Sequence, residues 1–127
     1  NCGEIDIMEH VGFDPHKVFF SIHNTNLYGN VHGTSQQGVY ESNSLETSFH
    51  NYAIEWGENF IRGYIDDILY FDYSKNSESF NDWPYDNPFF LIINLAIGGE
   101  WGGIQGIDNS IFPASFVIDY VRLYIKN

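Results

Sequence analysis

Basic residues are scarce in this chain of 127 residues, and the shortage excludes several kinds of partner. Only 5 lysines and arginines stand against 17 aspartates and glutamates, which gives a formal net charge of −12. Nucleic acids and anionic membrane surfaces bind to basic patches, so neither is expected to be a partner. A neutral polysaccharide would meet no repulsion here, whereas a heavily sulfated one would.

Cysteine and long apolar segments are scarce as well. Cys2 is the only cysteine, so the chain cannot form an internal disulfide. No apolar run reaches the roughly 18 residues of a membrane-spanning helix, and no signal peptide is recognisable. The chain starts inside an expected strand, without a leader or an initiator methionine. We therefore expect this start to be a cut rather than a natural N-terminus.

Aromatic residues, by contrast, are abundant, with nine tyrosines, eleven phenylalanines and three tryptophans. Such a composition suits β-structure, and a few exposed rings among them would be enough to form a surface on which sugar rings stack. Most of the rings are expected to lie in the core.

Strand patterns dominate the chain, and no convincing helical periodicity interrupts them. The expected strands span residues 4–11, 18–24, 39–40, 49–56, 60–65, 68–73, 88–97 and 115–125. Residues 88–97 have the composition of a strand buried on both faces, and residues 98–106 are a glycine-rich loop. Many strands at short spacing predict an all-β sandwich of two antiparallel sheets. No internal repeat or domain boundary is visible in residues 1–127.

Three carboxylates are concentrated near the start of the chain, at Glu4, Asp6 and Glu9. Residues two apart on a strand share a face, so Glu4 and Asp6 are expected to point the same way. Strict alternation would send Glu9 to the opposite face. One extra residue, a β-bulge at Ile7–Met8, would return Glu9 to the face of the other two.

Three carboxylates on one face repel one another, so the arrangement costs stability and suggests a use. Retaining glycoside hydrolysis is such a use, because it needs an ionised nucleophile and a protonated acid roughly 5–5.5 Å apart. Neighbouring negative charge raises the pKa of the acid. From spacing alone, an acidic solvent-facing strand and a set of oxygen ligands for a cation remain alternatives.

These residues also resemble a known family. The run GEIDIMEHVG resembles the active-site strand of glycoside hydrolase family 16, in the branch whose pattern Glu-x-Asp-x-x-Glu contains the extra residue. The resemblance continues, in the family's order, through FHNYAIEWGENFIRGYIDD, WPYDNPFFLIINLAIGGEWGG and FPASFVIDYVRLY. It implies a jelly-roll β-sandwich and an endo-β-1,3-glucanase that resembles bacterial laminarinases.

The resemblance assigns roles to residues near the catalytic strand. It implies that Glu4 is the nucleophile, Asp6 the assisting carboxylate and Glu9 the general acid/base. His23 matches a cleft position on the neighbouring strand, where it would contact the sugar at the cleavage point or tune Glu9. A structural role for this histidine is the alternative.

Further residues match family positions farther along the chain. Asn94 matches a position that hydrogen-bonds substrate, and Trp101 matches a cleft tryptophan that stacks on a glucose ring. Trp83 is expected to add a second stacking platform, whereas Trp56 is expected in the core. Family members commonly bind one structural Ca²⁺, and Asp119 matches its side-chain ligand; an ordinary outward-facing aspartate is the alternative.

The resemblance covers about half of the family's domain, because the half that precedes the catalytic strand is not in this sequence. We expect that half, with further cleft strands and calcium ligands, to come from a longer polypeptide or a second chain. Cys2 stands where some relatives have an aromatic residue. Secretion, or anchoring at the bacterial cell surface, is expected.

The leading functional hypothesis is endo-hydrolysis of β-1,3-glucosidic bonds in a laminarin-type β-glucan, by a retaining double displacement. A mixed-linkage β-1,3-1,4-glucanase is the nearest alternative. Agarose or carrageenan is disfavoured because a sulfated chain would want more than five basic residues. A non-catalytic glucan-binding module and a calcium-binding structural domain are alternatives of other classes.

Overall fold

The computed structural model describes residues 3–28 and 36–125 of the chain, which divides into two compact units, Asn1–Phe90 and Leu91–Asn127. Each unit is described by itself. Cys2 lies outside the described residues. Within the described ranges, no helix is long and apolar enough to cross a membrane.

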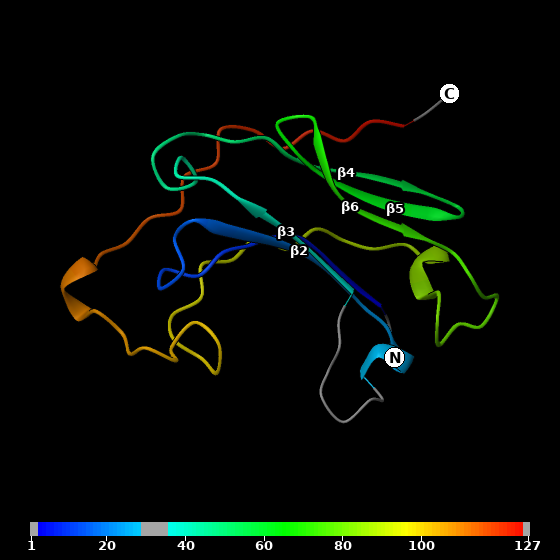
Figure 1. Ribbon diagram of the computed structural model, residues 1–127, viewed down its shortest axis with the longest axis horizontal. Coiled ribbons are helices and arrows are strands. Elements are labelled where there is room, and N and C mark those ends of the chain that lie inside the picture. Colours follow the sequence, from blue (N-terminus) through cyan, green and yellow to red (C-terminus); the bar gives the residue numbers. More distant parts are fainter. Residues whose placement is uncertain (1–2, 29–35, 126–127) are drawn as a thin grey trace. The chain divides into compact units, whose positions relative to one another are not determined.

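The first unit contains two three-stranded antiparallel sheets that face each other (Figure 1). The central strands are β2 in the first sheet and β5 in the second. The strands are β1 (Glu4–Glu9), β2 (Lys17–His23), β3 (Gln36–Glu41), β4 (Tyr52–Gly57), β5 (Phe60–Ile65) and β6 (Ile68–Ser74). Strand β3 contacts β6 and strand β1 contacts β4. The expected all-β architecture of two antiparallel sheets is confirmed.

The strand boundaries follow local chemistry. Strands β5 and β6 are joined by a two-residue turn in which Asp66 and Asp67 have positive φ angles of 47° and 66°, the conformation that tight hairpins favour. Strand β4 begins three residues later than expected. His50, just before it, contacts that turn, where its Nδ1 lies 2.6 Å from Asp66 Oδ2. The short helix α1 (Thr25–Tyr28) lies in a segment that we expected to be loop.

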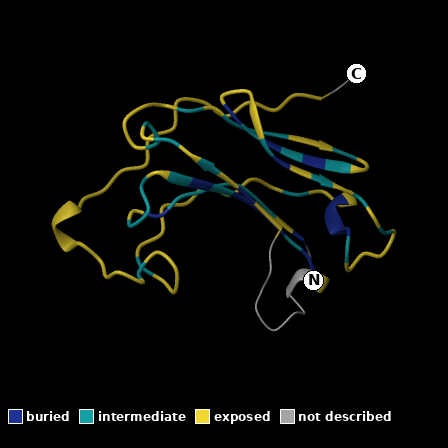
Figure 2. Cartoon of the chain, in the orientation of Figure 1, coloured by how far each residue is buried: buried dark blue, intermediate teal, exposed yellow. Residues whose placement is uncertain are grey.

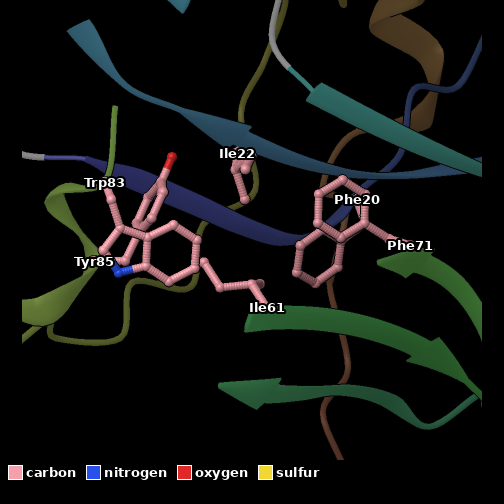
Figure 3. Close-up of a cluster of buried hydrophobic side chains, with 6 residues drawn as sticks. All are labelled: Phe20, Ile22, Ile61, Phe71, Trp83 and Tyr85. Atoms are coloured by element: carbon pink, nitrogen blue, oxygen red, sulfur yellow. The ribbon is translucent and has the colours of Figure 1, made fainter. Parts of the chain in front are cut away.

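The core lies between the two sheets and is largely aromatic (Figure 3). It consists of Phe20 and Ile22 from β2, Ile61 from β5, Phe71 from β6, and Trp83 and Tyr85 from the segment around the 3₁₀ helix η1 (Pro84–Asp86). The Phe20 and Phe71 rings stack across the interface with centroids 4.6 Å apart. Burial of such rings contributes most of the hydrophobic stabilisation of a small sandwich.

The second unit contains the 3₁₀ helix η2 (Asn109–Ile111) but no strand within residues 91–125. The expectation of strands at residues 88–97 and 115–125 is therefore wrong for this structure. A strand needs ladder hydrogen bonds to a neighbour, and an apolar pattern does not supply that neighbour. Most side chains of this unit are exposed (Figure 2).

Candidate active site

The register of β1 against β2 contains the extra residue that the carboxylate spacing predicts. Glu4 pairs with His23 and Asp6 with Ser21, but Glu9 pairs with Phe19. Three steps along β1 therefore correspond to two along β2, and the irregularity lies between Asp6 and Glu9. The predicted β-bulge is confirmed.

The two faces of this sheet have opposite character. Ile5 and Ile7 of β1 pack against the core, as do Phe20 and Ile22 of β2. The side chains that alternate with them, including the carboxylates of β1, belong to the other face. The bulge is also tied to the second sheet, because the hydroxyl of Tyr70 on β6 donates a hydrogen bond of 3.4 Å to the backbone carbonyl of Ile7.

Asp6 and His23 form an ion pair on the polar face. His23 Nε2 lies 3.0 Å from Asp6 Oδ2, and each side chain is 21% exposed. The hydrogen bond to Asp6 raises the pKa of His23, and the charges of Asp6, Glu4 and Glu9 add to this effect. The surroundings of His23 therefore favour its protonated form. His23 contacts Asp6 directly and also lowers the pKa of Glu9. Its predicted contact with the sugar at the cleavage point remains a prediction.

The pKa values of Glu4 and Glu9 are both raised. Burial raises the pKa of Glu4, and the charge of Asp6 raises it further, while His23 lowers it. Burial also raises the pKa of Glu9, and a hydrogen bond from Ser21 partly offsets this. Carboxyl groups with raised pKa values beside ionised neighbours are typical of acid–base catalysis.

The same cluster contains the atoms that could hold a metal ion. Glu4, Asp6 and His23 each offer one ligand atom, and among the described residues these atoms lie within 4.8 Å of one another. Two of those atoms, Asp6 Oδ2 and His23 Nε2, are already in direct contact with each other at 3.0 Å. The contact between Asp6 and His23 also suits proton transfer, so the geometry is compatible with an acid–base cluster.

Two polar residues that our reading of the sequence missed extend this face. Ser21 Oγ donates a 2.7 Å hydrogen bond to Glu9 Oε2. Gln37 on β3 in turn donates a 3.2 Å hydrogen bond from Nε2 to Ser21 Oγ. A signal existed for Ser21, because it lies two residues before His23 and so shares its face of the strand.

The segment around η1 supports the start of β1 and the end of β2. Tyr85 donates a 2.8 Å hydrogen bond from its hydroxyl to the backbone carbonyl of His23. A Cβ atom at Gly3 would lie 2.5 Å from Pro84 Cγ and 2.7 Å from Tyr85 Cε1. Only glycine therefore lets the chain pass so close to these rings just before Glu4.

The exposures of Trp83 and Trp56, the tryptophans of the first unit, are the reverse of those expected. Trp83 is only 3% exposed, stacks on Tyr73 with centroids 5.9 Å apart and donates a 2.9 Å hydrogen bond to Asp86. Its predicted role as a stacking platform for sugar is wrong, because neither face of a buried ring is accessible. Trp56, expected in the core, is 41% exposed and donates from Nε1 to the backbone carbonyl of Tyr85 at 3.0 Å.

The other predicted site residues belong to the second unit. Trp101 is exposed and lies in a glycine-rich series of turns, in which Gly98, Gly99 and Gly106 have positive φ angles. Asn94 and Asp119 are also exposed. Their predicted roles in substrate and calcium binding remain predictions.

Known proteins resemble this chain over nearly its whole length. A beta-glucanase of Rhodothermus marinus is 46% identical over 127 aligned residues, which cover 96% of this chain and 44% of that protein. The structure of the laminarinase from Rhodothermus marinus matches with a TM-score of 0.80 and 43% identity, over 87% of this chain and 46% of that one. A keratan-sulfate endo-1,4-beta-galactosidase of Sphingobacterium multivorum is 36% identical, over 98% of this chain and 28% of that protein.

The chain thus spans less than half the length of these relatives. The two antiparallel sheets are part of the jelly-roll sandwich that the sequence predicts. The pattern of the glycosyl hydrolases family 16 matches residues 1–122. The chain therefore belongs to glycosyl hydrolase family 16.

Proposed function

We propose that the protein containing this chain is a retaining endo-β-1,3-glucanase that cleaves laminarin-type β-glucans. The observation that carries the proposal is the bulge in β1, which lets three carboxylates act on one face of a sheet. The similarity to a laminarinase supports β-1,3-glucan as the substrate class.

In the proposed mechanism Glu4 attacks the anomeric carbon while Glu9 donates its proton to the glycosidic oxygen that leaves. Glu9, now ionised, then takes a proton from water, and the hydroxide formed displaces Glu4 from the covalent glycosyl-enzyme. Asp6, the assisting carboxylate, is close enough to Glu4 to influence its pKa and would hold it in orientation. His23, 3.0 Å from Asp6, limits the accumulation of negative charge on this face when it is protonated.

Further features fit a neutral polysaccharide. Trp101 would stack on a glucose ring of the substrate, and Asn94 would form a hydrogen bond with the polysaccharide. Asp119 would contribute to one structural Ca²⁺ site, for which carboxylate oxygen is a suitable ligand. A net charge of −12 disfavours sulfated substrates such as the one named for the Sphingobacterium relative. A polymeric substrate that cannot enter a cell also favours secretion.

The substitution Glu4→Gln in the full-length protein tests the catalytic assignment. It keeps the shape of the side chain but removes the nucleophile, so hydrolysis of laminarin should fall by a factor on the order of 10³ or more. Glu58→Gln is a matched control, because Glu58 is an exposed turn residue and should leave activity unchanged. Activity in Glu4→Gln close to that of the wild type would rule the assignment out.

Substrate and stereochemistry need separate measurements. Product analysis on laminarin, lichenan and agarose should show cleavage of laminarin, whereas preference for lichenan would favour the mixed-linkage alternative. Proton NMR of the first products should show the β-anomer, since a double displacement retains configuration. A wild-type protein that binds laminarin without cleaving it would instead be a glucan-binding module.

A further inference from the structure

Ser21 is a buried polar residue at the middle of the central strand of the first sheet. Its side chain is only 1% exposed, and its hydroxyl lies between Glu9 on β1 and Gln37 on β3. A buried hydroxyl must be hydrogen-bonded, because leaving its polar atoms without partners is costly. The partners of Ser21 are therefore part of what holds this site.

The direction of the two hydrogen bonds follows from the donors available. The amide nitrogen of Gln37 can only donate, so it occupies a lone pair of Ser21 Oγ. Serine has one hydroxyl proton, which then points to Glu9 Oε2 at 2.7 Å. The two hydrogen bonds thus run in one direction, from Gln37 on β3 through Ser21 on β2 to Glu9 on β1.

We infer that Ser21, oriented by Gln37, is a positioning residue that holds Oε2 of Glu9 and leaves Oε1 as the oxygen that carries the catalytic proton. The inference rests on the proposed role of Glu9 as general acid/base. A carboxylic acid with both oxygens free could place its proton on either one and rotate it away from the substrate. With Oε2 accepting from Ser21, the proton on Oε1 is directed to the glycosidic oxygen.

The same hydrogen bond affects both halves of the reaction. A hydroxyl donates more strongly to a carboxylate than to a carboxylic acid, so Ser21 stabilises Glu9 when it must act as a base. Burial has the opposite effect on Glu9 and favours its acid form. Among the residues that the structure describes, the charged or titratable groups that act on Glu9 are Asp6 and Glu4 on its own strand and His23 on β2.

Substitution of Ser21 separates positioning from a merely structural role. In the full-length protein, Ser21→Ala should raise the pKa of Glu9, and the alkaline limb of the kcat/KM profile should move up by about one pH unit. The kcat should fall roughly tenfold with little change in KM. Titration of the Glu9 carboxyl by ¹³C NMR should show the same shift directly, and Ser21→Thr, which keeps a hydroxyl, should restore the wild-type titration.

Gln37 provides a second test that leaves the buried residue Ser21 itself unchanged. It is exposed on β3, so Gln37→Ala should fold even where a change at Ser21 does not. The substitution frees the Ser21 hydroxyl to rotate, so the Glu9 titration should shift in the same direction by a smaller amount. Gln36→Ala is the matched control, because Gln36 is the exposed neighbour that points to the opposite face.

The outcomes distinguish this inference from the proposed function. A Glu9 titration and pH profile that are unchanged in Ser21→Ala, or in Gln37→Ala if the first variant does not fold, would overturn the inference while leaving glucan hydrolysis intact. A wild-type protein with no hydrolase activity would instead overturn the proposed function, and with it any catalytic role for Glu9.

Discussion

Gly63, in β5, lies directly against the ring of Phe20 on β2, the strand that also carries Ser21 and His23. A Cβ atom added there would lie 2.4 Å from Cδ2 and 2.8 Å from Cε2 of the Phe20 ring. Phe20 is fully buried and already stacks on Phe71, so it has little room to move. We therefore predict that Gly63→Ala destabilises the fold.

The size of the effect follows from two opposing contributions. Overpacking a dense core costs about 1–3 kcal/mol, whereas replacing glycine by alanine inside a strand regains about 0.5–1 kcal/mol of conformational entropy. Because a contact of 2.4 Å is a severe overlap, the cost should lie in the upper part of its range, and the free energy of unfolding should fall by about 1–2.5 kcal/mol. Phe20→Leu should remove part of the clash, so the double variant should lose less stability than the sum of the two single variants.

Urea denaturation of the full-length protein, followed by tryptophan fluorescence, measures these differences. Gly12→Ala is the matched control, because a Cβ atom at this exposed turn glycine would meet nothing within 4 Å. Its unfolding free energy should change by less than about 0.5 kcal/mol. If Gly63→Ala were as stable as Gly12→Ala, or if the Phe20 and Gly63 effects were additive, the described packing of the two sheets would be wrong.

Two further predictions concern contacts around the site and the β5–β6 turn. Tyr70→Phe removes the 3.4 Å hydrogen bond to Ile7 in the bulge; it should cost about 1 kcal/mol or less and lower kcat more than it raises KM in steady-state assays. His50→Ala tests the contact between His50 and Asp66. The hydrogen bond to Asp66 raises the pKa of His50. The hydrogen bond from the backbone N–H of Asn51 lowers the pKa of Asp66, and the hydrogen bond to His50 lowers it further. The contribution of His50 to stability is complete below its unfolded pKa of about 6.5 and is lost as pH rises through its folded pKa. The contribution of Asp66 to stability is present above its unfolded pKa of about 3.9 and is lost as pH falls through its folded pKa. The loss of stability in His50→Ala should thus be larger at pH 5.5 than at pH 9 in urea denaturation, and a pH-independent loss would contradict the assignment.

The β-bulge could be predicted from the sequence because strand geometry has a fixed period. Side chains alternate between the two faces of a strand, so residues separated by an odd interval, such as Glu4 and Glu9, point to opposite faces. One extra residue in a β-bulge is the simplest way to bring all three carboxylates to one face. The register between Glu9 and Phe19 confirms that solution. Alternation also accounts for the inward packing of Ile5 and Ile7.

Other features depend on contacts between distant residues and were not predictable in the same way. Trp83 lies in a polar stretch that suggested exposure, but Tyr73 covers its ring and Asp86 accepts its N–H. Strands at 88–97 and 115–125 required pairing partners, which the residues of those segments do not specify. Gln37 lies opposite Ser21 only because β2 and β3 pair in one particular register.

The crowded carboxylate face has a measurable consequence for stability, which the variant Glu4→Gln reveals. The pKa of Glu4 is raised by burial and by Asp6, so the folded state binds this proton more tightly than the unfolded state does. Stability is therefore lost as pH rises from the unfolded pKa of about 4.3 through the folded value. Glutamine does not titrate, so this variant should be more stable than the wild type at pH 7, and the difference should shrink below about pH 4. Denaturation at pH 7 that found Glu4→Gln no more stable than the wild type would mean that these carboxylates do not strain the fold.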